Sequence, residues 1–285
     1  MEDHRVVAVG MDQPIFRAAA EARHLRSGQP LTEILRKGSA QVGAARFDEA
    51  ANWYRAVTGS QRLAAQLRIA SLLAKQKGVE AGREYLKTVK TDDPQQATQL
   101  VLAEAQLLRD AKSYPAAFDL LSRAAAEQPE STDILYDRAM TAEKLDRLDV
   151  VEADLRKVIA LNPEHAHAYN ALGYTFAERG TRLDEALALI TKAHELAPDD
   201  PFVLDSLGWV NYRLGKTVDG LTYLRSAYAA RPDPEIAAHL GEVLWAEGRR
   251  DEAKKVWSQA LAKHPDNKAL IDVMRKFKAG TGRKP

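Results

Sequence analysis

One pattern of residues is written three times between residues 166 and 267. Each copy carries a Leu-Gly pair near its start and a proline near its end, and the copies are 33 to 35 residues apart. A period of this length is typical of a solenoid of helical hairpins, because one hairpin cannot bury its own apolar face and must stack on its neighbours. The eighth residue of each copy is Gly173, Gly208 or Gly241.

Small residues at fixed positions predict where two helices of a hairpin cross, because they let the helix backbones approach closely. In the second helix of each copy these positions are held by Ala186, Gly220 and Ala253, and seven residues later by Ala193, Ala227 and Ala260. Between them lie large apolar residues that we expect to fill the gap at the crossing: Ile190, Leu224 and Trp257.

Glycine and proline predict the ends of the helices. Gly180, Gly215 and Gly248 fall where the first helix must end, a place suited to a residue that can take φ > 0. The proline near the end of each copy is expected to stop the second helix, because proline lacks an N–H donor and restricts the residue before it.

These residues resemble the tetratricopeptide repeat family, whose pattern is W-x-x-L-G-x-x-Y, then A, then F, A and P across 34 residues. Here the first copy carries an inserted residue at or near Arg182, and Gly220 replaces the usual alanine in the second. The same register extends upstream through small residues at the eighth position: Gly38, Ser71, Ala105, Ala139 and Gly173. A proline series follows it: Pro94, Pro129, Pro163, Pro198, Pro232 and Pro265.

We therefore expect an all-α chain, a right-handed superhelical solenoid of about seven tetratricopeptide-type hairpins with a C-terminal capping helix. The expected hairpins span residues 31–63, 64–97, 98–131, 132–165, 166–200, 201–233 and 234–267. Residues 1–30 are expected to form an N-terminal helix or partial repeat, 268–278 the capping helix with a polar outer face, and 279–285 a disordered tail.

Composition argues against several classes of function. The formal net charge is +1, so nothing marks a nucleic-acid binder, and the absence of cysteine excludes disulfides, thiol catalysis and cysteine-bound metals. No window approaches the ~20 apolar residues of a membrane span. No Ser-His-Asp or paired-carboxylate set recurs on one face, which favours a non-enzymatic protein without cofactors.

Two local patterns are weak candidates for chemistry. His165 and His167 lie two apart, on different faces of a helix start, with no third ligand at suitable spacing, so no metal site is predicted. The glycines and basic residues of 280–284 lack the spacing of a phosphate-binding loop. A third histidine, His239, is expected to be buried or interhelical.

A stacked array of hairpins offers a concave groove lined by the first helices. The second, fifth, ninth, twelfth and thirteenth residues of each unit should share the inward stripe. We predict that it binds an extended or helical peptide, with aromatics taking apolar side chains and Asn170 holding the backbone; the site residues are Tyr136, Asn170, Tyr174, Asp205, Trp209, Tyr212, Arg213, Glu242 and Trp245. In the last four units this stripe holds six acids, among them Glu178, against two bases, which favours basic residues in the partner. The alternative is that the aromatics only pack one repeat on the next.

Residues 132–267 also resemble a narrower group, proteobacterial repeat proteins attached to the outer membrane as lipoproteins. Members similar to this chain bind a periplasmic carboxyl-terminal processing protease and present cell-wall hydrolases to it. The resemblance implies an adaptor on the periplasmic side of the outer membrane, without direct membrane insertion. This location requires a longer N-terminus, because residues 6–11 are too short for a secretory signal and no cysteine is present for acylation.

Two hypotheses follow. In the first, the chain is a non-enzymatic scaffold or adaptor of the periplasm. In the second, the chain is either a cytoplasmic repeat module, complete as written, that scaffolds or regulates an enzyme or a polysaccharide-export assembly, or a repeat segment cut from a multidomain enzyme.

Overall fold

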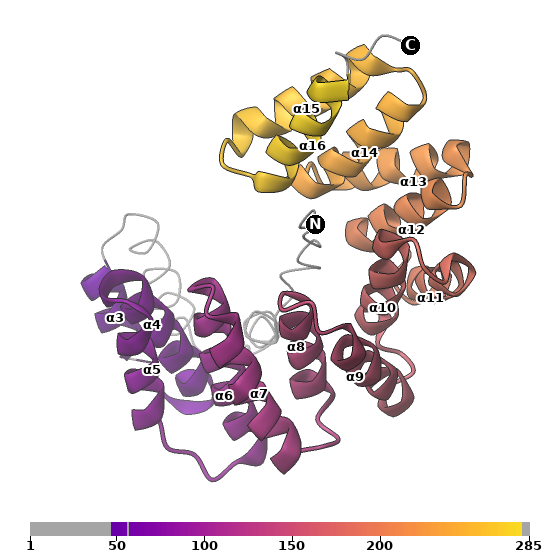
Figure 1. Cartoon of the computed structure of the whole chain (residues 1–285). Helices are drawn as coiled ribbons and strands as arrows, with labels where there is room; N and C mark the ends of the chain where they lie inside the picture. The colour runs from indigo at the N-terminus through magenta and orange to yellow at the C-terminus, as the bar shows by residue number, and fades with distance from the viewer. Residues whose placement is uncertain (1–46, 56, 281–285) are drawn as a thin grey trace. The chain divides into compact units, whose positions relative to one another are not determined.

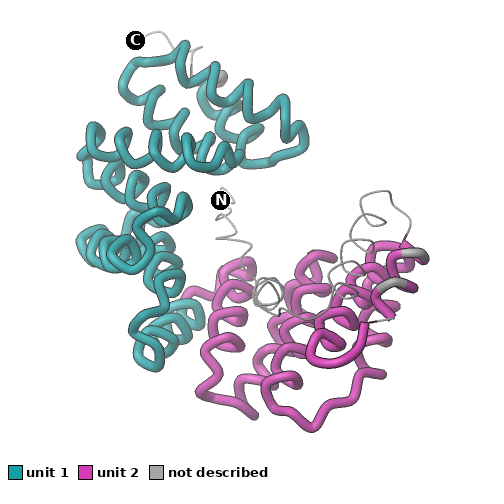
Figure 2. Tube along the Cα trace, turned by 180° about the vertical axis from the view of Figure 1, so that it is seen from behind, with its two compact units in different colours: residues 1–9, 149–285 teal, residues 10–148 magenta. Residues whose placement is uncertain are grey.

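Residues 47–55 and 57–280 are described by the structure, a computed structural model. Their regular structure consists of fourteen α-helices and one turn of 3-10 helix, with no strand in these residues (Figure 1). This confirms the all-α prediction. The described chain divides into two compact units, an N-terminal unit of residues 47–148 and a C-terminal unit of residues 149–280 (Figure 2).

The N-terminal unit is a sequence of helices joined by short turns, and each helix packs on the next. Its helices are α3 (Phe47–Arg55), α4 (Arg62–Lys77), α5 (Val79–Thr88), α6 (Pro94–Asp110), α7 (Tyr114–Glu127) and α8 (Thr132–Glu143), and η2 (Gly59–Gln61) precedes α4. The core of this unit includes Ala50 and Tyr54 of α3 and Leu121 of α7, all three buried.

The C-terminal unit begins at α9 and contains three successive helical hairpins, in which α10 packs on α11, α12 on α13, and α14 on α15. The first helices also contact one another, α10 with α12 and α12 with α14. The last helix, α16, packs on α14 and α15 with Leu270 fully buried. The helices are α9 (Leu148–Leu161), α10 (Ala166–Arg179), α11 (Leu183–Leu196), α12 (Pro201–Arg213), α13 (Thr217–Ala230), α14 (Pro234–Ala246), α15 (Arg250–Lys263) and α16 (Lys268–Gly280).

Glycine at the eighth position lies where the two helices of a hairpin cross. A Cβ atom on Gly208 would stand 2.6 Å from Leu224 Cγ and 2.9 Å from the carbonyl oxygen of Gly220, so no larger residue fits without movement. The predicted close crossing is therefore confirmed, with the predicted partners. The equivalent contacts are those of Gly173 with Ala186 and Ile190 and of Gly241 with Trp257.

A residue with positive φ stands in the turn after each first helix that the structure describes. After α6, α8, α10, α12 and α14, the N–H of the residue that follows it bonds to a carbonyl five residues earlier, as from Thr181 to Phe176 (3.0 Å), which satisfies a free carbonyl at the helix end. The predicted positive φ of the three glycines is confirmed. The full series is Gly78 (94°), Lys112 (58°), Asp146 (58°), Gly180 (64°), Gly215 (80°) and Gly248 (78°). Arg182, at the expected insertion, also has a positive φ of 47°.

The proline series closes the second helices with one exception. Each of five prolines lies two residues after the last residue of a helix: Pro129, Pro163, Pro198, Pro232 and Pro265. Pro94 does not, because it is the first residue of α6, and the side chain of Asp93 caps that helix by accepting from Gln95 N (2.8 Å). The prediction was wrong there, since an Asp-Pro pair is also a helix start. The expected boundary between residues 97 and 98 falls inside α6.

A second correction concerns the hairpin of α4 and α5. Ser71 was expected at its crossing, but a Cβ atom on Gly82 of α5 would stand 2.6 Å from the carbonyl oxygen of Ala70. Ala70 is buried and Ser71 is half-buried. The crossing therefore lies at Ala70, one residue before Ser71. The small residue that allows the close approach is Gly82 of the second helix.

Several expectations fall outside the described residues: the N-terminal helix or partial repeat of residues 1–30, the first helix of the unit 31–63 with Gly38, and residues 281–285 of the expected tail. Residues 279 and 280, also assigned to the tail, belong to α16. None of the described helices combines the length and apolar character that crossing a membrane requires.

Candidate functional site

The predicted binding stripe lies on the first helices of three successive hairpins in the C-terminal unit. We call the following set the first-helix face: Asn170, Tyr174 and Glu178 of α10, Asp205, Trp209 and Tyr212 of α12, and His239 and Glu242 of α14. Four of its predicted members form a buried centre: Asn170, Tyr174, Asp205 and Trp209. Tyr212 and Glu242 are half-buried at its rim.

Aspartate caps fix where two of the three helices that carry this face begin. Asp200 accepts hydrogen bonds from Phe202 N (2.8 Å) and Val203 N (3.2 Å) at the start of α12. Asp233 does the same for Glu235 N (2.9 Å) at the start of α14. Proline follows each aspartate at the first helical position, where its missing N–H costs nothing. These caps set which side chains of α12 and α14 face α10.

His239 joins the three helices. Its Nδ1 lies 2.9 Å from Oδ2 and 3.0 Å from Oδ1 of Asp205, and its Nε2 lies 3.3 Å from the hydroxyl oxygen of Tyr174. When both ring nitrogens are protonated, His239 donates to Asp205 and to Tyr174 at once. A side chain of α14 thus holds α12 and α10 together.

Three carboxylates set the protonation of His239. Burial lowers the pKa of the imidazole, but Asp205, by charge and hydrogen bond, and Glu178 and Glu242, by charge, together raise it to about 9. His239 is therefore protonated at neutral pH. Its positive charge is compensated inside the first-helix face.

Trp209 is the centre of an aromatic stack. Its ring lies on His239 with centroids 4.4 Å apart and is tilted against Tyr212 at 5.4 Å. The guanidinium of Arg213 lies 5.7 Å from the Trp209 ring, and its Nη1 donates to the main-chain oxygen of Glu178 (2.8 Å). Arg213, a predicted binding residue, thus satisfies a carbonyl at the C-terminal end of α10.

Polar atoms without hydrogen-bond partners gather on this face. Among the described residues, Nδ2 and Oδ1 of Asn170, Oε2 of Glu178 and Nε1 of Trp209 are buried and make no hydrogen bond. Asn170 is fully buried. Buried polar groups are nearly always paired, so unpaired ones that share a face call for a specific explanation.

Trp245 belongs to a different cluster. Its ring stacks on Trp257 of α15 (5.8 Å) and lies against Phe277 of α16 (5.4 Å). Glu242, one turn before it, pairs with Lys276 of α16 (2.9 Å). These two predicted site residues therefore make contacts with the last helix, although Glu242 also acts on His239 through its charge.

Tyr136, the remaining predicted site residue, lies on α8 of the N-terminal unit and is half-buried. On the same helix Asp137 pairs with Arg109 of α6 (2.9 Å), and burial, opposed by Arg109, raises the pKa of the Asp137 carboxyl. A contact between the first helices of successive hairpins therefore also occurs in this unit.

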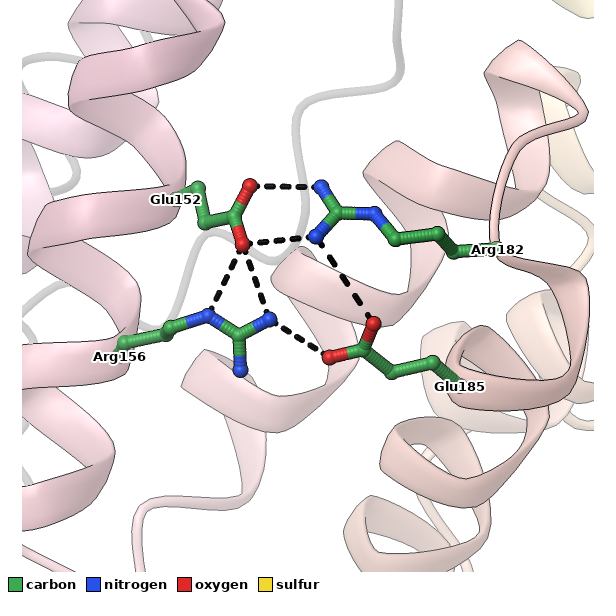
Figure 3. Close-up of polar contacts among 4 residues, drawn as sticks. All are labelled: Glu152, Arg156, Arg182 and Glu185. Carbon is green, nitrogen blue, oxygen red and sulfur yellow. Dashed lines mark hydrogen bonds and ion pairs between the residues drawn. The ribbon is translucent and has the colours of Figure 1, made fainter.

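The second helices carry an exposed ion network (Figure 3). Arg182 donates to both oxygens of Glu152 (2.8 and 2.6 Å), and Arg156 bridges Glu152 (2.9 Å) to Glu185 (2.6 Å). Hydrogen bonds from Arg182, outweighing partial burial, lower the pKa of Glu152 to about 2. This network links α9 to the turn before α11 and to α11 itself.

In the part of the chain that the structure describes, no three or more His, Cys, Asp or Glu residues are grouped so as to hold a metal ion.

Two segments of the chain match models of known repeat families. Residues 136–201 and 239–267 match family models described as tetratricopeptide repeat. These matches support the interpretation that the chain is a tetratricopeptide repeat protein. The two segments include the members of the first-helix face on α10 and α14, whereas those on α12 lie between the segments.

One curated relative is also named for its tetratricopeptide repeats. The tetratricopeptide repeat-containing protein PA4667 of Pseudomonas aeruginosa is 46% identical over 184 residues, which is 65% of this chain and 31% of that protein. This chain therefore spans less than a third of the relative's length.

Solved structures agree with the fold. The tetratricopeptide repeat protein TTC0263 of Thermus thermophilus aligns over 64% of this chain and 97% of its own, with a TM-score of 0.57 and 25% identity. A tetratricopeptide repeat protein from Parabacteroides merdae aligns over 87% of this chain and 98% of its own, with a TM-score of 0.63 and 14% identity. The second likeness shows the fold alone.

His239 is central to the first-helix face, but it is not at one of the five positions predicted to share the inward stripe. It lies at the sixth position of its repeat unit, next to the fifth position, which is one of those five. Its burial was expected, but its pairing with Asp205 was not. The sequence does contain a signal for this pair. Asp205 is the fifth residue of its repeat and His239 is the sixth residue of the next, so both side chains lie where α12 contacts α14.

Proposed function

We propose that this chain is a non-enzymatic adaptor whose first-helix face binds a segment of a partner protein. The tetratricopeptide repeat fold suggests a protein–protein interaction scaffold. The observation that carries the proposal is the buried amide of Asn170, which has neither a donor nor an acceptor for it among the described residues. An unpaired buried polar group costs about 1–3 kcal/mol, so its partner is expected to come from outside these residues.

The chemistry of Asn170 matches a peptide backbone. Its side chain offers an N–H donor and a carbonyl acceptor in one plane, and an extended peptide presents the complementary C=O and N–H groups. Nε1 of Trp209 adds another buried donor that has no hydrogen-bond partner among the described residues. Tyr212, half-buried beside Trp209, adds aromatic surface for an apolar side chain.

In its sharper form, the proposal names the partner as a periplasmic carboxyl-terminal processing protease, to which the adaptor presents cell-wall hydrolases at the inner side of the outer membrane. What supports this form is the resemblance of residues 132–267 to the lipoprotein adaptors of such proteases. Support for the face as the contact comes from Asn170 and Trp209 and is independent of that resemblance.

The test is a direct binding measurement with purified proteins. The immobilised chain and its Asn170→Leu variant are titrated with the processing protease of the same organism by biolayer interferometry. Wild type should bind, and Asn170→Leu should bind about tenfold more weakly, because two neutral hydrogen bonds of about 0.5–1.5 kcal/mol each are lost.

A matched control separates binding from folding. Ser122 of α7, in the N-terminal unit, has a buried hydroxyl with no hydrogen-bond partner in the part of the chain that the structure describes, so Ser122→Ala removes the same kind of group away from the first-helix face. This control should bind like wild type. If the protease does not bind wild type, the sharper form fails; equal binding of Asn170→Leu and wild type would place the contact elsewhere.

A further inference from the structure

The carboxylates of the first-helix face are not equally available to a partner. Asp205 is held by protonated His239 at 2.9 Å, and Glu242 is held by Lys276 at 2.9 Å. Each of these acids already has a cation at hydrogen-bond distance. A partner that approached them would have to displace an existing pair.

Glu178 differs from both. Its Oε2 is buried and has no hydrogen-bond partner among the described residues. The nearby guanidinium of Arg213 donates to the main-chain oxygen of Glu178 and lies over Trp209. A buried carboxylate oxygen without a donor is costly, so this position is suited to a cation supplied from outside.

Glu178 also has a suitable position relative to Asn170. The two residues are eight apart on α10, with Tyr174 midway, so they lie on one side of the helix about 12 Å apart along its axis. An extended peptide covers about 12 Å in three to four residues. One peptide can therefore contact both the amide and the carboxylate.

We propose that Glu178 binds the side chain of a lysine or arginine in the partner segment, three to four residues from the place where Asn170 holds the backbone. This inference rests on the proposed function and makes it more specific. It assigns the preference for basic residues to one carboxylate, whereas the acidic stripe as a whole predicts only a diffuse attraction.

The experiment uses a phage library of random 12-residue peptides selected on the full chain. Three proteins are compared: wild type, Glu178→Gln and Glu195→Gln. The two variants are matched, because each removes one negative charge, and Glu195 is an exposed residue of the second helix α11, outside the first-helix face. Wild type and Glu195→Gln should enrich a lysine or arginine at one position, and Glu178→Gln should not.

A selected peptide is then synthesised with its basic residue kept or replaced by glutamine, and binding is measured by fluorescence anisotropy. The replacement should weaken binding to wild type about 10- to 100-fold and leave binding to Glu178→Gln unchanged, as expected for a lost hydrogen bond between charged groups.

The outcomes separate this inference from the proposed function. Enriched peptides without a basic residue, or an equal basic preference in Glu178→Gln, would overturn the role of Glu178 and leave peptide binding intact. If wild type enriches no peptide at all, both the inference and peptide binding by this face are overturned.

Discussion

The imidazole of His239 lies 2.9 Å from the carboxylate of Asp205, and both groups are buried. The pair joins α12 to α14, two first helices from successive repeats. A buried charged pair of this kind makes the stability of the C-terminal unit depend on pH, since loss of one charge leaves the other without compensation.

The first prediction concerns alkaline pH. The folded-state pKa of His239 is about 9, above the value of about 6.5 expected in the unfolded chain. Its contribution to stability is therefore fully present below about pH 6.5 and is lost as pH rises through about 9, with a size on the order of 3 kcal/mol.

Urea unfolding at pH 7 and pH 10 measures this contribution, with His239→Gln as the reference because other groups also titrate in this range. Wild type should lose more stability than the variant between the two pH values. Parallel losses in the two proteins would mean that His239 has no raised pKa in the folded state.

The second prediction concerns the helix crossing. Gly208→Ala should destabilise the chain by about 1–3 kcal/mol, because its Cβ would stand 2.6 Å from Leu224 Cγ and 2.9 Å from the carbonyl oxygen of Gly220. Gly248→Ala is the control, since its Cβ meets no atom within 4 Å and only the positive φ of 78° opposes it. Thermal unfolding should show the larger loss for Gly208→Ala; a loss no greater than that of the control would show that the crossing can relax.

The third prediction is a stabilising change. Lys112 holds the left-handed place that glycine holds in other repeats, with φ of 58°. Lys112→Gly should raise the free energy of unfolding by about 0.5–1 kcal/mol, because glycine adopts this conformation without a steric penalty. Lys255→Gly, on an exposed position inside α15, should instead cost about 1 kcal/mol. Chemical denaturation that shows both changes destabilising would contradict the prediction.

The fourth prediction concerns the ion network of the second helices. Glu152→Gln should cost less than about 1 kcal/mol at low salt, and this difference should shrink in 1 M salt, because the network is partly exposed. The pKa of Glu152 is lowered to about 2, so its contribution is present above about pH 4.5 and is lost as pH falls toward 2. Melting temperatures of the two proteins should therefore converge in acid; a difference that persists at pH 2 and in 1 M salt would argue for a packing effect.

The repeat period was sufficient to predict the helical hairpins, their crossings and their left-handed turns, because each depends on local spacing. Pro94 was placed wrongly because proline follows helices and also starts them. The preceding aspartate is the distinguishing signal: Asp93 precedes Pro94 as Asp200 and Asp233 precede the prolines that start α12 and α14.

Spacing predicts which residues of the first helices lie on one side, but not the contacts that these residues make; that this side binds a partner stays a prediction. Spacing places Asp205 and Glu242 on one side of their helices, yet it cannot show that His239 and Lys276 neutralise them. Likewise, whether the amide of Asn170 finds a hydrogen-bond partner depends on the groups that neighbouring helices bring near it. The sequence pattern of one helix does not show this; among the described residues the amide has no such partner.

The hydrogen bond between Tyr174 and His239 spans 65 residues and passes over an entire repeat. Stability in repeat arrays is usually a sum of single repeats and of interfaces between immediate neighbours, so that one end can fray while the rest stays folded. Here the repeats that begin with α10 and α14 are joined directly by this hydrogen bond, in addition to their contacts with the repeat between them, which begins with α12. Under a pulling force or in native-state hydrogen exchange, α10, α12 and α14 should open in one step, so that the whole first-helix face is either formed or lost.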